Sequence, residues 1–187
     1  PTHPFFTQPS FSTERAVRLA NQLLMLARAE VGFHRADGMQ ILDLRRVVEE
    51  IAGNLVPAAI AKKIDLGLEL QPAQIHGDPF LIAELLSNLI DNAIAYTPAG
   101  GRITVTTMSD AGFAVLQVED DGVGIPEAER DLVFGRFYRI SGSSGEGCGL
   151  GLAIAQEIAH LHDGEIAISV PQSGTGTLIS VRIPGVA

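Results

Sequence analysis

The sequence is short of several residue types, and each shortage narrows what the protein can be. Its 187 residues include one cysteine, Cys148, so an intrachain disulfide and a cysteine-built zinc site are both excluded. Such a composition is typical of a reducing, cytoplasmic setting. No apolar run approaches the roughly 20 residues that a membrane-spanning helix needs, and we find no secretory signal. We therefore expect no membrane contact by this fragment.

Positive charge is also scarce. Lys and Arg number 13 against 22 Asp and Glu, and the formal net charge is -9 at pH 7. A general nucleic-acid binder usually carries a basic patch or stripe, so we expect no nucleic-acid partner. A polyanionic nucleotide would have to be held by local groups such as helix N-termini, backbone amides and a cation. Hydrophobic residues make up 46% of the chain, which is enough for a sizeable core.

Periodicity divides the chain into an N-terminal segment, residues 1–37, and one domain, residues 38–187. Residues 1–12 contain three prolines and no periodic pattern. In residues 13–30, apolar side chains recur at near-helical spacing, which predicts an amphipathic helix. Its apolar stripe packs either on its own domain or in a helical bundle shared with a second chain. The following residues, up to Gly38, have the composition of a linker.

The domain mixes helical and strand patterns without strict alternation, which disfavours a doubly wound parallel sheet. Helices are predicted from Asp43 to about Lys63, over 79–96 and over 150–162, with Asp43 and Asp78 as N-caps and Gly164 as a C-cap. Strands are predicted over 40–42, 64–70, 102–107, 113–119, 165–170 and 177–183. Residues 141–149 are too rich in Gly and Ser to form an element. We predict an α+β fold, a two-layer α/β sandwich whose mixed sheet carries three helices on one face.

The predicted helix over 79–96 contains two asparagines, Asn88 and Asn92, which lie one turn apart at the edge of its apolar stripe. Asparagine costs about half a kcal/mol in a helix relative to alanine, so two in mid-helix need a reason. They are either a tolerated polar flank or a pair of amide oxygens aimed at a metal-phosphate group. Magnesium prefers hard oxygen ligands and keeps several waters, so one or two side-chain oxygens suffice.

Two glycine-containing motifs follow. Residues 120–124 (DDGVG) come directly after a strand, where an acid can accept a hydrogen bond from an amino group and glycines allow a flat ring to approach. A simple tight turn is the alternative. Residues 145–152 (GEGCGLGL) lead into a helix, whose first backbone amides can bind phosphate, although a linker would have a similar composition. This segment matches neither a P-loop nor a Rossmann turn.

The order of these motifs resembles the N, G1, F and G2 boxes of bacterial two-component sensor histidine kinases. The matching segments are Asn88 with Asn92, residues 120–124, residues 134–139 (FGRFYR) and residues 147–151. Histidine kinase catalytic domains share the Bergerat fold with a wider superfamily of ATPases and kinases. The resemblance covers about residues 38–184, and residues 15–30 look like the end of the family's dimerisation helix.

The resemblance implies a site for ATP and Mg²⁺. Asp120 would contact the adenine amino group, and Gly122 and Gly124 would give room for the base. Asn88 would be the magnesium ligand, with Asn92 close to the phosphates and the metal. The remaining residues implied to bind the nucleotide are Tyr96, which would line the site, and Arg136, Gly147, Gly149, Leu150 and Gly151 around the phosphate end and a mobile lid over 136–148.

The implied reaction is transfer of the ATP γ-phosphate to a histidine on a dimerisation helix that is absent from this chain. The phosphate would then pass to the receiver domain of a response regulator. None of the five histidines of the sequence stands in the family's phosphoacceptor motif, so no catalytic residue is assigned here. The implied partners are the dimerisation helices of the parent kinase and the receiver domain, and the implied parent is a homodimer anchored in the inner membrane.

Three other activities remain open at this stage. An ATP-hydrolysing clamp of the same superfamily would have a glutamate where Asn88 stands, to activate water. A non-catalytic nucleotide sensor is kept open by Ala95, because the family often has Lys or Arg there to reach a phosphate. A serine kinase acting on a partner protein is the third, and the predicted helix over 13–30 favours the histidine kinase over it.

Overall fold

The computed structural model describes residues 38–140 and 148–186, which belong to one compact unit, His34–Ala187. The predicted helix over 13–30 and most of the linker lie outside the described residues. The elements follow in the order β1 (Gln40–Asp43), α2 (Leu44–Ala61), β2 (Asp65–Leu70), β3 (Gln74–Gly77), α3 (Pro79–Tyr96), β4 (Arg102–Asp110), β5 (Phe113–Asp120), η2 (Glu127–Glu129), η3 (Leu132–Phe134), α4 (Gly151–Leu161), β6 (Glu165–Ser169) and β7 (Thr177–Pro184).

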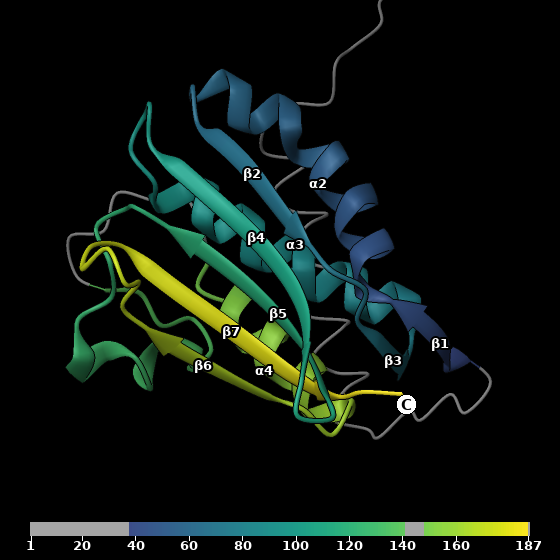
Figure 1. Cartoon of the computed structure of the whole chain (residues 1–187). Coiled ribbons are helices and arrows are strands. Elements are labelled where there is room, and N and C mark those ends of the chain that lie inside the picture. Colours follow the sequence, from purple (N-terminus) through teal and green to yellow (C-terminus); the bar gives the residue numbers. More distant parts are fainter. Residues whose placement is uncertain (1–37, 141–147, 187) are drawn as a thin grey trace, which may run out of the picture. The chain divides into compact units, whose positions relative to one another are not determined.

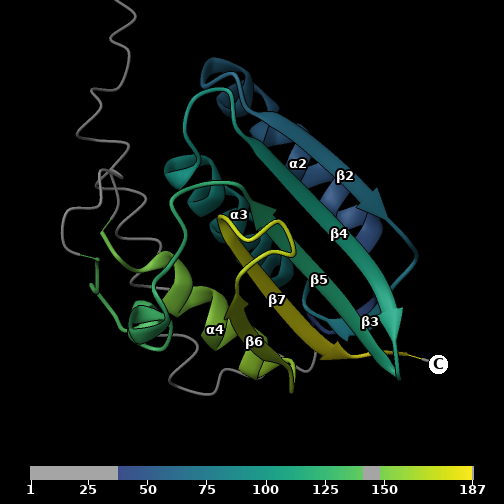
Figure 2. The same ribbon diagram turned by 60° about the vertical axis from the view of Figure 1, so that its left-hand side comes forward.

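A five-stranded mixed sheet forms one layer, in the order β2-β4-β5-β7-β6. The β2–β4 pair is parallel, and the other three pairs are antiparallel. Figure 1 looks onto this sheet with α2, α3 and α4 behind it, and the turned view of Figure 2 shows the same separation into two layers. The predicted two-layer α+β fold with three helices on one face is confirmed.

The core lies between the sheet and the helices, and strand alternation decides which side chains enter it. On β4, Ile103, Val105 and Thr107 are buried, and they pair in register with Asp120, Val118 and Leu116 of β5. The same β5 residues pair with Thr177, Ile179 and Val181 of β7. Each row across the covered face is therefore a set of buried side chains, and the row at one end contains Asp120 and Thr177 where the others are mostly aliphatic.

The two predicted aspartate caps are present. The Asp43 carboxylate accepts a hydrogen bond from the Arg45 backbone N–H at 3.0 Å, at the start of α2. Asp78 accepts from the Phe80 and Leu81 backbone N–H groups at 2.8 and 3.2 Å, at the start of α3. A side-chain acceptor satisfies donors that the helix itself leaves unpaired, which explains why both helices begin where the sequence indicated.

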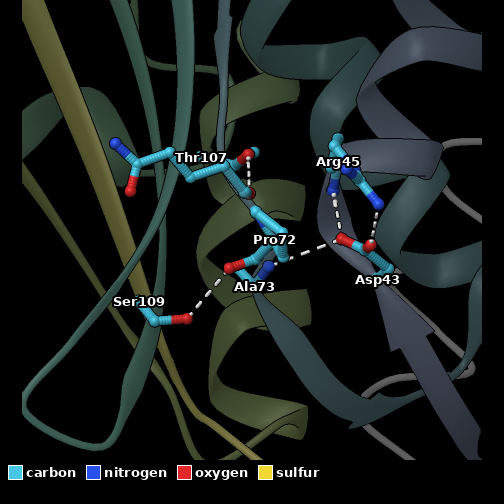
Figure 3. Close-up of polar contacts among 7 residues, drawn as sticks. Asp43, Arg45, Pro72, Ala73, Thr107 and Ser109 are labelled. Carbon is cyan, nitrogen blue, oxygen red and sulfur yellow. Dashed lines mark hydrogen bonds and ion pairs between the residues drawn. The ribbon is translucent and has the colours of Figure 1, made fainter.

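Strand β3, which the sequence pattern did not predict, pairs antiparallel with β1 in a separate two-stranded sheet. Four residues after a proline give too short an alternation to be read as a strand. Figure 3 shows what holds the link ahead of β3. The Thr107 hydroxyl donates to the Gln71 carbonyl at 2.7 Å, the Ser109 hydroxyl donates to the Pro72 carbonyl at 3.1 Å, and the Ala73 N–H donates to the Asp43 carboxylate at 3.4 Å.

A buried histidine joins two of the helices. His162, at the end of α4, accepts a hydrogen bond at Nε2 from the Asp78 backbone N–H at 3.1 Å, and its Nδ1 lies 2.7 Å from the Ile158 carbonyl. Both ring nitrogens therefore have partners within the core, as a structural histidine requires. Within the described ranges, no helix combines the length and apolarity needed to cross a bilayer.

Candidate functional site

Asp120 is a buried carboxylate on a face of the sheet whose other buried side chains are mostly aliphatic. It ends β5 on the covered face of the sheet, and only 6% of it is exposed. Its Oδ1 accepts a hydrogen bond from the Gly122 backbone N–H at 2.9 Å. Burial raises the pKa of the Asp120 carboxyl above its usual value, although hydrogen bonds from Gly122 and from the backbone and hydroxyl of Thr177 act in the opposite direction. A poorly solvated acceptor of this kind gains from an N–H donor on a ligand.

The chain after Asp120 lies directly against the end of α3. A Cβ atom at Gly122 would lie 2.7 Å from the Tyr96 carbonyl oxygen and 2.8 Å from the Asp120 Oδ1. Glycine is therefore required here by the protein's own packing, and its predicted role of making room for a base stays a prediction. Gly124 has φ +73, a conformation that favours glycine, and approaches the backbone of Gly176.

Asn88 and the start of α4 form a second part of the site. The Asn88 side chain is 6% exposed, and its Nδ2 donates to the Glu84 carbonyl of its own helix at 2.9 Å. Its Oδ1 lies 3.2 Å from where a Cβ atom on Gly151 would be, so the amide oxygen faces the first residue of α4. This oxygen is therefore presented beside a helix N-terminus, where backbone N–H groups and the helix dipole favour anions.

The start of α4 differs from the starts of the other two helices. Its N-cap residue is Leu150, which is fully buried and makes no side-chain capping bond. In α2 and α3, by contrast, Asp43 and Asp78 occupy the caps. The first N–H groups of α4 thus receive no acidic side chain from their N-cap, which suits a helix end that binds an external anion.

One flank of α3 connects the two parts. Asn88, Asn92 and Tyr96 follow one another at helical-turn spacing, and the last two are half-buried. Asn88 faces Gly151 at one end of this flank, and the Tyr96 carbonyl touches the Gly122 backbone at the other. The eight steps along the helix from Asn88 to Tyr96 span about 12 Å at 1.5 Å per residue, so the site is elongated.

The segments that flank residues 141–147 meet at their ends. The Phe137 N–H donates to the Gly149 carbonyl at 2.8 Å, and Gly149 has φ +71. A Cβ atom on Gly149 would lie 2.6 Å from the Tyr138 carbonyl oxygen, so only glycine fits. Arg136 is exposed just ahead of this contact, and its predicted role at the phosphates stays a prediction. Gly147 and most of the predicted lid lie outside the described residues.

Two residues of this region were missed by the sequence analysis. Thr177, at the start of β7, pairs in register with Asp120, and its backbone and hydroxyl act to lower the pKa of that carboxyl. Lys62, which follows α2, donates through Nζ to the Ile94 carbonyl at 2.7 Å and to the Ala95 carbonyl at 2.8 Å. Both contacts join segments that are more than thirty residues apart in the chain, and no local pattern signals them.

The described part of the chain offers no metal cage of its own. Within residues 38–140 and 148–186, no group of three or more His, Cys, Asp or Glu side chains is placed to hold a metal ion. A hard cation at the Asn88 oxygen would have to complete its coordination with ligand oxygens and water. Magnesium bound together with phosphates has this coordination habit.

Several known proteins are similar to this chain in sequence. The family described as histidine kinase-, DNA gyrase B-, and HSP90-like ATPase matches residues 77–186. The sensor protein kinase PmrB of Pseudomonas aeruginosa is 36% identical over 178 residues, which are 95% of this chain and 37% of that protein. The sensor histidine kinase RppB of Synechocystis is 35% identical over 175 residues, which are 91% of this chain and 38% of that protein. The chain thus spans well under half the length of these curated relatives.

Solved structures give the same result. The mycobacterial sensor histidine kinase MprB superposes with a TM-score of 0.69 at 32% identity, over 79% of this chain and 97% of that one. The ATP binding domain of PrrB from Mycobacterium tuberculosis superposes with a TM-score of 0.65 at 26% identity, over 80% of this chain and 99% of that one. Nearly the whole of each structure is therefore matched by the domain described above.

Proposed function

Because this chain belongs to the family of histidine kinase-, DNA gyrase B- and HSP90-like ATPases, we propose that it binds Mg-ATP and donates the γ-phosphate to a histidine of a sensor kinase. The observation that carries the proposal is the shared flank of α3. The buried Asp120 carboxylate lies at one end of this flank, and the Asn88 amide oxygen and the N-terminus of α4 lie at the other.

The proposed position of the base is at Asp120. The adenine amino group donates to this carboxylate, which is desolvated and already held in place by Gly122 and Thr177. A carboxylate fixed in this way distinguishes an amino group from a carbonyl, because a carbonyl oxygen would face it acceptor to acceptor. We therefore expect adenine nucleotides to be preferred over guanine nucleotides, whose ring carries a carbonyl at the corresponding position.

The proposed position of the phosphates is between Asn88 and the start of α4. The amide oxygen of Asn88 is a hard ligand that suits Mg²⁺, and the N–H groups at the start of α4 suit the phosphate oxygens. Bound magnesium would supply neutralisation of phosphate charge. Asn92 and Tyr96 line the flank between the two ends, and Gly149, Leu150 and Gly151 shape the phosphate end.

The proposed reaction needs a partner histidine. Its ring nitrogen attacks the γ-phosphorus, a P–N bond forms, and the bond from phosphorus to the oxygen bridging to the β-phosphate breaks, so that ADP leaves. The proton of the attacking ring passes to a base or to water outside this chain. The chain contributes positioning and charge neutralisation, as is general in phosphoryl transfer. The partners are the dimerisation helices of a homodimeric parent kinase and then the aspartate of a receiver domain.

A phosphotransfer assay tests this proposal. The chain is incubated with magnesium, γ-labelled ATP and the dimerisation helices of the parent kinase, supplied as a separate polypeptide. We expect an acid-labile, alkali-stable phosphate on the helices, and much slower labelling with Asn88→Ala. Release of inorganic phosphate without labelled helices would instead support an ATP-hydrolysing clamp. Nucleotide binding with neither product would support the non-catalytic sensor.

A further inference from the structure

We propose that Lys62 is a positioning residue for the adenine end of the nucleotide site. Its ammonium group fixes the last turn of α3, against which the segment carrying Asp120 rests. The inference rests on the proposed function, since it assigns Lys62 to the binding of the adenine nucleotide. Lys62 itself is not proposed to touch the ligand.

The last turn of α3 leaves backbone carbonyls that the helix cannot satisfy. The Ala93 carbonyl accepts from the Thr97 N–H at 2.9 Å, and α3 has no basic residue in its last turn. The Lys62 ammonium supplies donors for the next two carbonyls, those of Ile94 and Ala95. A cation at this end of a helix interacts favourably with the helix dipole as well as with the unpaired oxygens.

The carbonyl of Tyr96, the next residue of α3, lies against the segment of residues 120–124, which we call the binding motif. A Cβ atom on Gly122 would be 2.7 Å from this oxygen, so the Gly122 backbone packs on it without spare room. Gly122 in turn donates its N–H to Asp120 at 2.9 Å. Lys62 therefore reaches the carboxylate through one continuous set of contacts: two α3 carbonyls, the Tyr96 backbone and Gly122.

The turn that carries Lys62 is tied to the same region by its backbone. The Gly100 N–H donates to the Lys62 carbonyl at 3.3 Å, and the Asp65 N–H donates to the Gly101 carbonyl at 2.9 Å. On the other side of this loop, the Arg102 N–H donates to Asp121, the neighbour of Asp120, at 2.8 Å. The start of β4 is thus held between the Lys62 turn and the binding motif.

The neighbouring Lys63 provides a matched control. It is exposed, it has φ +58, and it lies one residue further along the same turn. Replacing either lysine by methionine removes one positive charge and keeps most of the aliphatic stem. A difference between the two variants therefore reports the contacts of the Lys62 ammonium rather than a change in net charge.

The experiment measures dissociation constants of adenosine, ADP and a non-hydrolysable ATP analogue by calorimetry on the 187-residue chain, at temperatures where each variant is folded by circular dichroism. For Lys62→Met we expect all three constants to rise by a similar factor, about three- to tenfold. The hydrogen bonds from the ammonium to the Ile94 and Ala95 carbonyls are lost, so the last turn of α3 no longer fixes the segment that carries Asp120. Lys62→Arg, which can also donate to two carbonyls, is expected to restore most of the affinity, and Lys63→Met to match the wild type. Lys62→Gln replaces Lys62→Met if the latter does not fold.

The outcomes separate the two proposals. Wild-type affinity for all three ligands in folded Lys62→Met or Lys62→Gln, even with lowered stability, would overturn the positioning role and leave the nucleotide site intact. A loss that grows with the number of phosphates would also overturn it, because the ammonium would then act on phosphate. A wild-type chain that binds none of the three ligands would reject the proposed function itself.

Discussion

Asp120 and Thr107 both place a buried polar side chain on the covered face of the sheet, but Thr107 lies two buried rows away from Asp120, toward the turn that joins β4 and β5. We call these two places the Asp120 end and the Thr107 end. Thr107 is fully buried, and its hydroxyl donates to the Gln71 carbonyl at 2.7 Å, closing the link between β2 and β3. Asp120 is almost as buried, yet its hydrogen bonds from Gly122 and Thr177 do not outweigh the loss of solvation. A single hydroxyl can be satisfied by one carbonyl, whereas a carboxylate with two oxygens retains accepting capacity.

The contrast indicates how to separate structural from binding polar groups in this core. At the Thr107 end, polar groups are paired with backbone groups, and their removal should affect stability alone. At the Asp120 end, a charged group is kept at a cost in stability beside a glycine that allows no side chain. Buried charged groups that lower stability in this way are typical of binding and catalytic sites. Variants at the two ends should therefore affect different quantities, and the following predictions test this from the largest expected effect to the smallest.

Gly122→Ala should strongly impair the Asp120 end. The added Cβ would meet the Tyr96 carbonyl at 2.7 Å, and neither backbone can give way easily. We expect a loss of about 1–3 kcal/mol in the free energy of unfolding together with weaker nucleotide binding. Gly53→Ala in α2 is the control, because a Cβ there meets nothing within 4 Å. Urea unfolding that gave the same stability for both variants would contradict the described packing.

Asn88→Ala should separate the two ends of the nucleotide site. Loss of the amide oxygen beside Gly151 is expected to weaken magnesium-dependent binding of an ATP analogue roughly tenfold, while adenosine affinity stays unchanged. Calorimetry with and without magnesium measures both quantities. An equal loss for adenosine and for the ATP analogue would show that Asn88 acts through the fold rather than at the phosphates.

Thr107→Val should change stability alone. The substitution keeps the shape of the side chain but leaves the Gln71 carbonyl without this donor, so we expect a loss of about 1 kcal/mol. The exposed Ser109 supports the same link through Pro72, and Ser109→Ala should cost less. Chemical denaturation of the two variants gives the comparison. A drop in nucleotide affinity in Thr107→Val would count against the division into a structural end and a binding end.

Asp120→Asn should stabilise the protein slightly at neutral pH. Because burial raises the pKa of Asp120 above its usual 3.8, the folded protein holds this proton more tightly than the unfolded chain does. Ionisation therefore lowers stability as pH rises from 3.8 through the raised pKa, and the penalty is constant above it. Removing the charge should therefore raise the stability of the folded protein at pH 7, by less than the effects predicted above.

The pH dependence supplies the control for this last prediction. The advantage of Asp120→Asn should shrink as pH falls through the raised pKa and vanish below 3.8, where the carboxyl is protonated in both states. Unfolding curves recorded at several pH values measure it. An advantage that grew on acidification would mean that the pKa is lowered rather than raised.

Much of the fold could be predicted from the sequence because its signals are local. Asp43 and Asp78 mark helix starts through bonds to residues two or three positions away, and strand alternation marked the buried rows. Asp120, Gly122 and Asn88 were likewise singled out by motifs within short segments, and their roles at a nucleotide stay predictions. Thr177 and Lys62 were not, because their contacts depend on strand register and on the packing of α2 against α3. Strand β3 was missed because four residues carry too little pattern.

The most direct test of the account is a calorimetric titration of a non-hydrolysable ATP analogue, with magnesium, into the wild type, Asp120→Ala and Thr107→Val. We predict that Asp120→Ala weakens binding on the order of 10- to 100-fold, because a hydrogen bond to a charged acceptor is lost. Thr107→Val should bind as the wild type does. Equal affinity in Asp120→Ala and the wild type would contradict the account, since the buried carboxylate would then serve the fold and not a nucleotide.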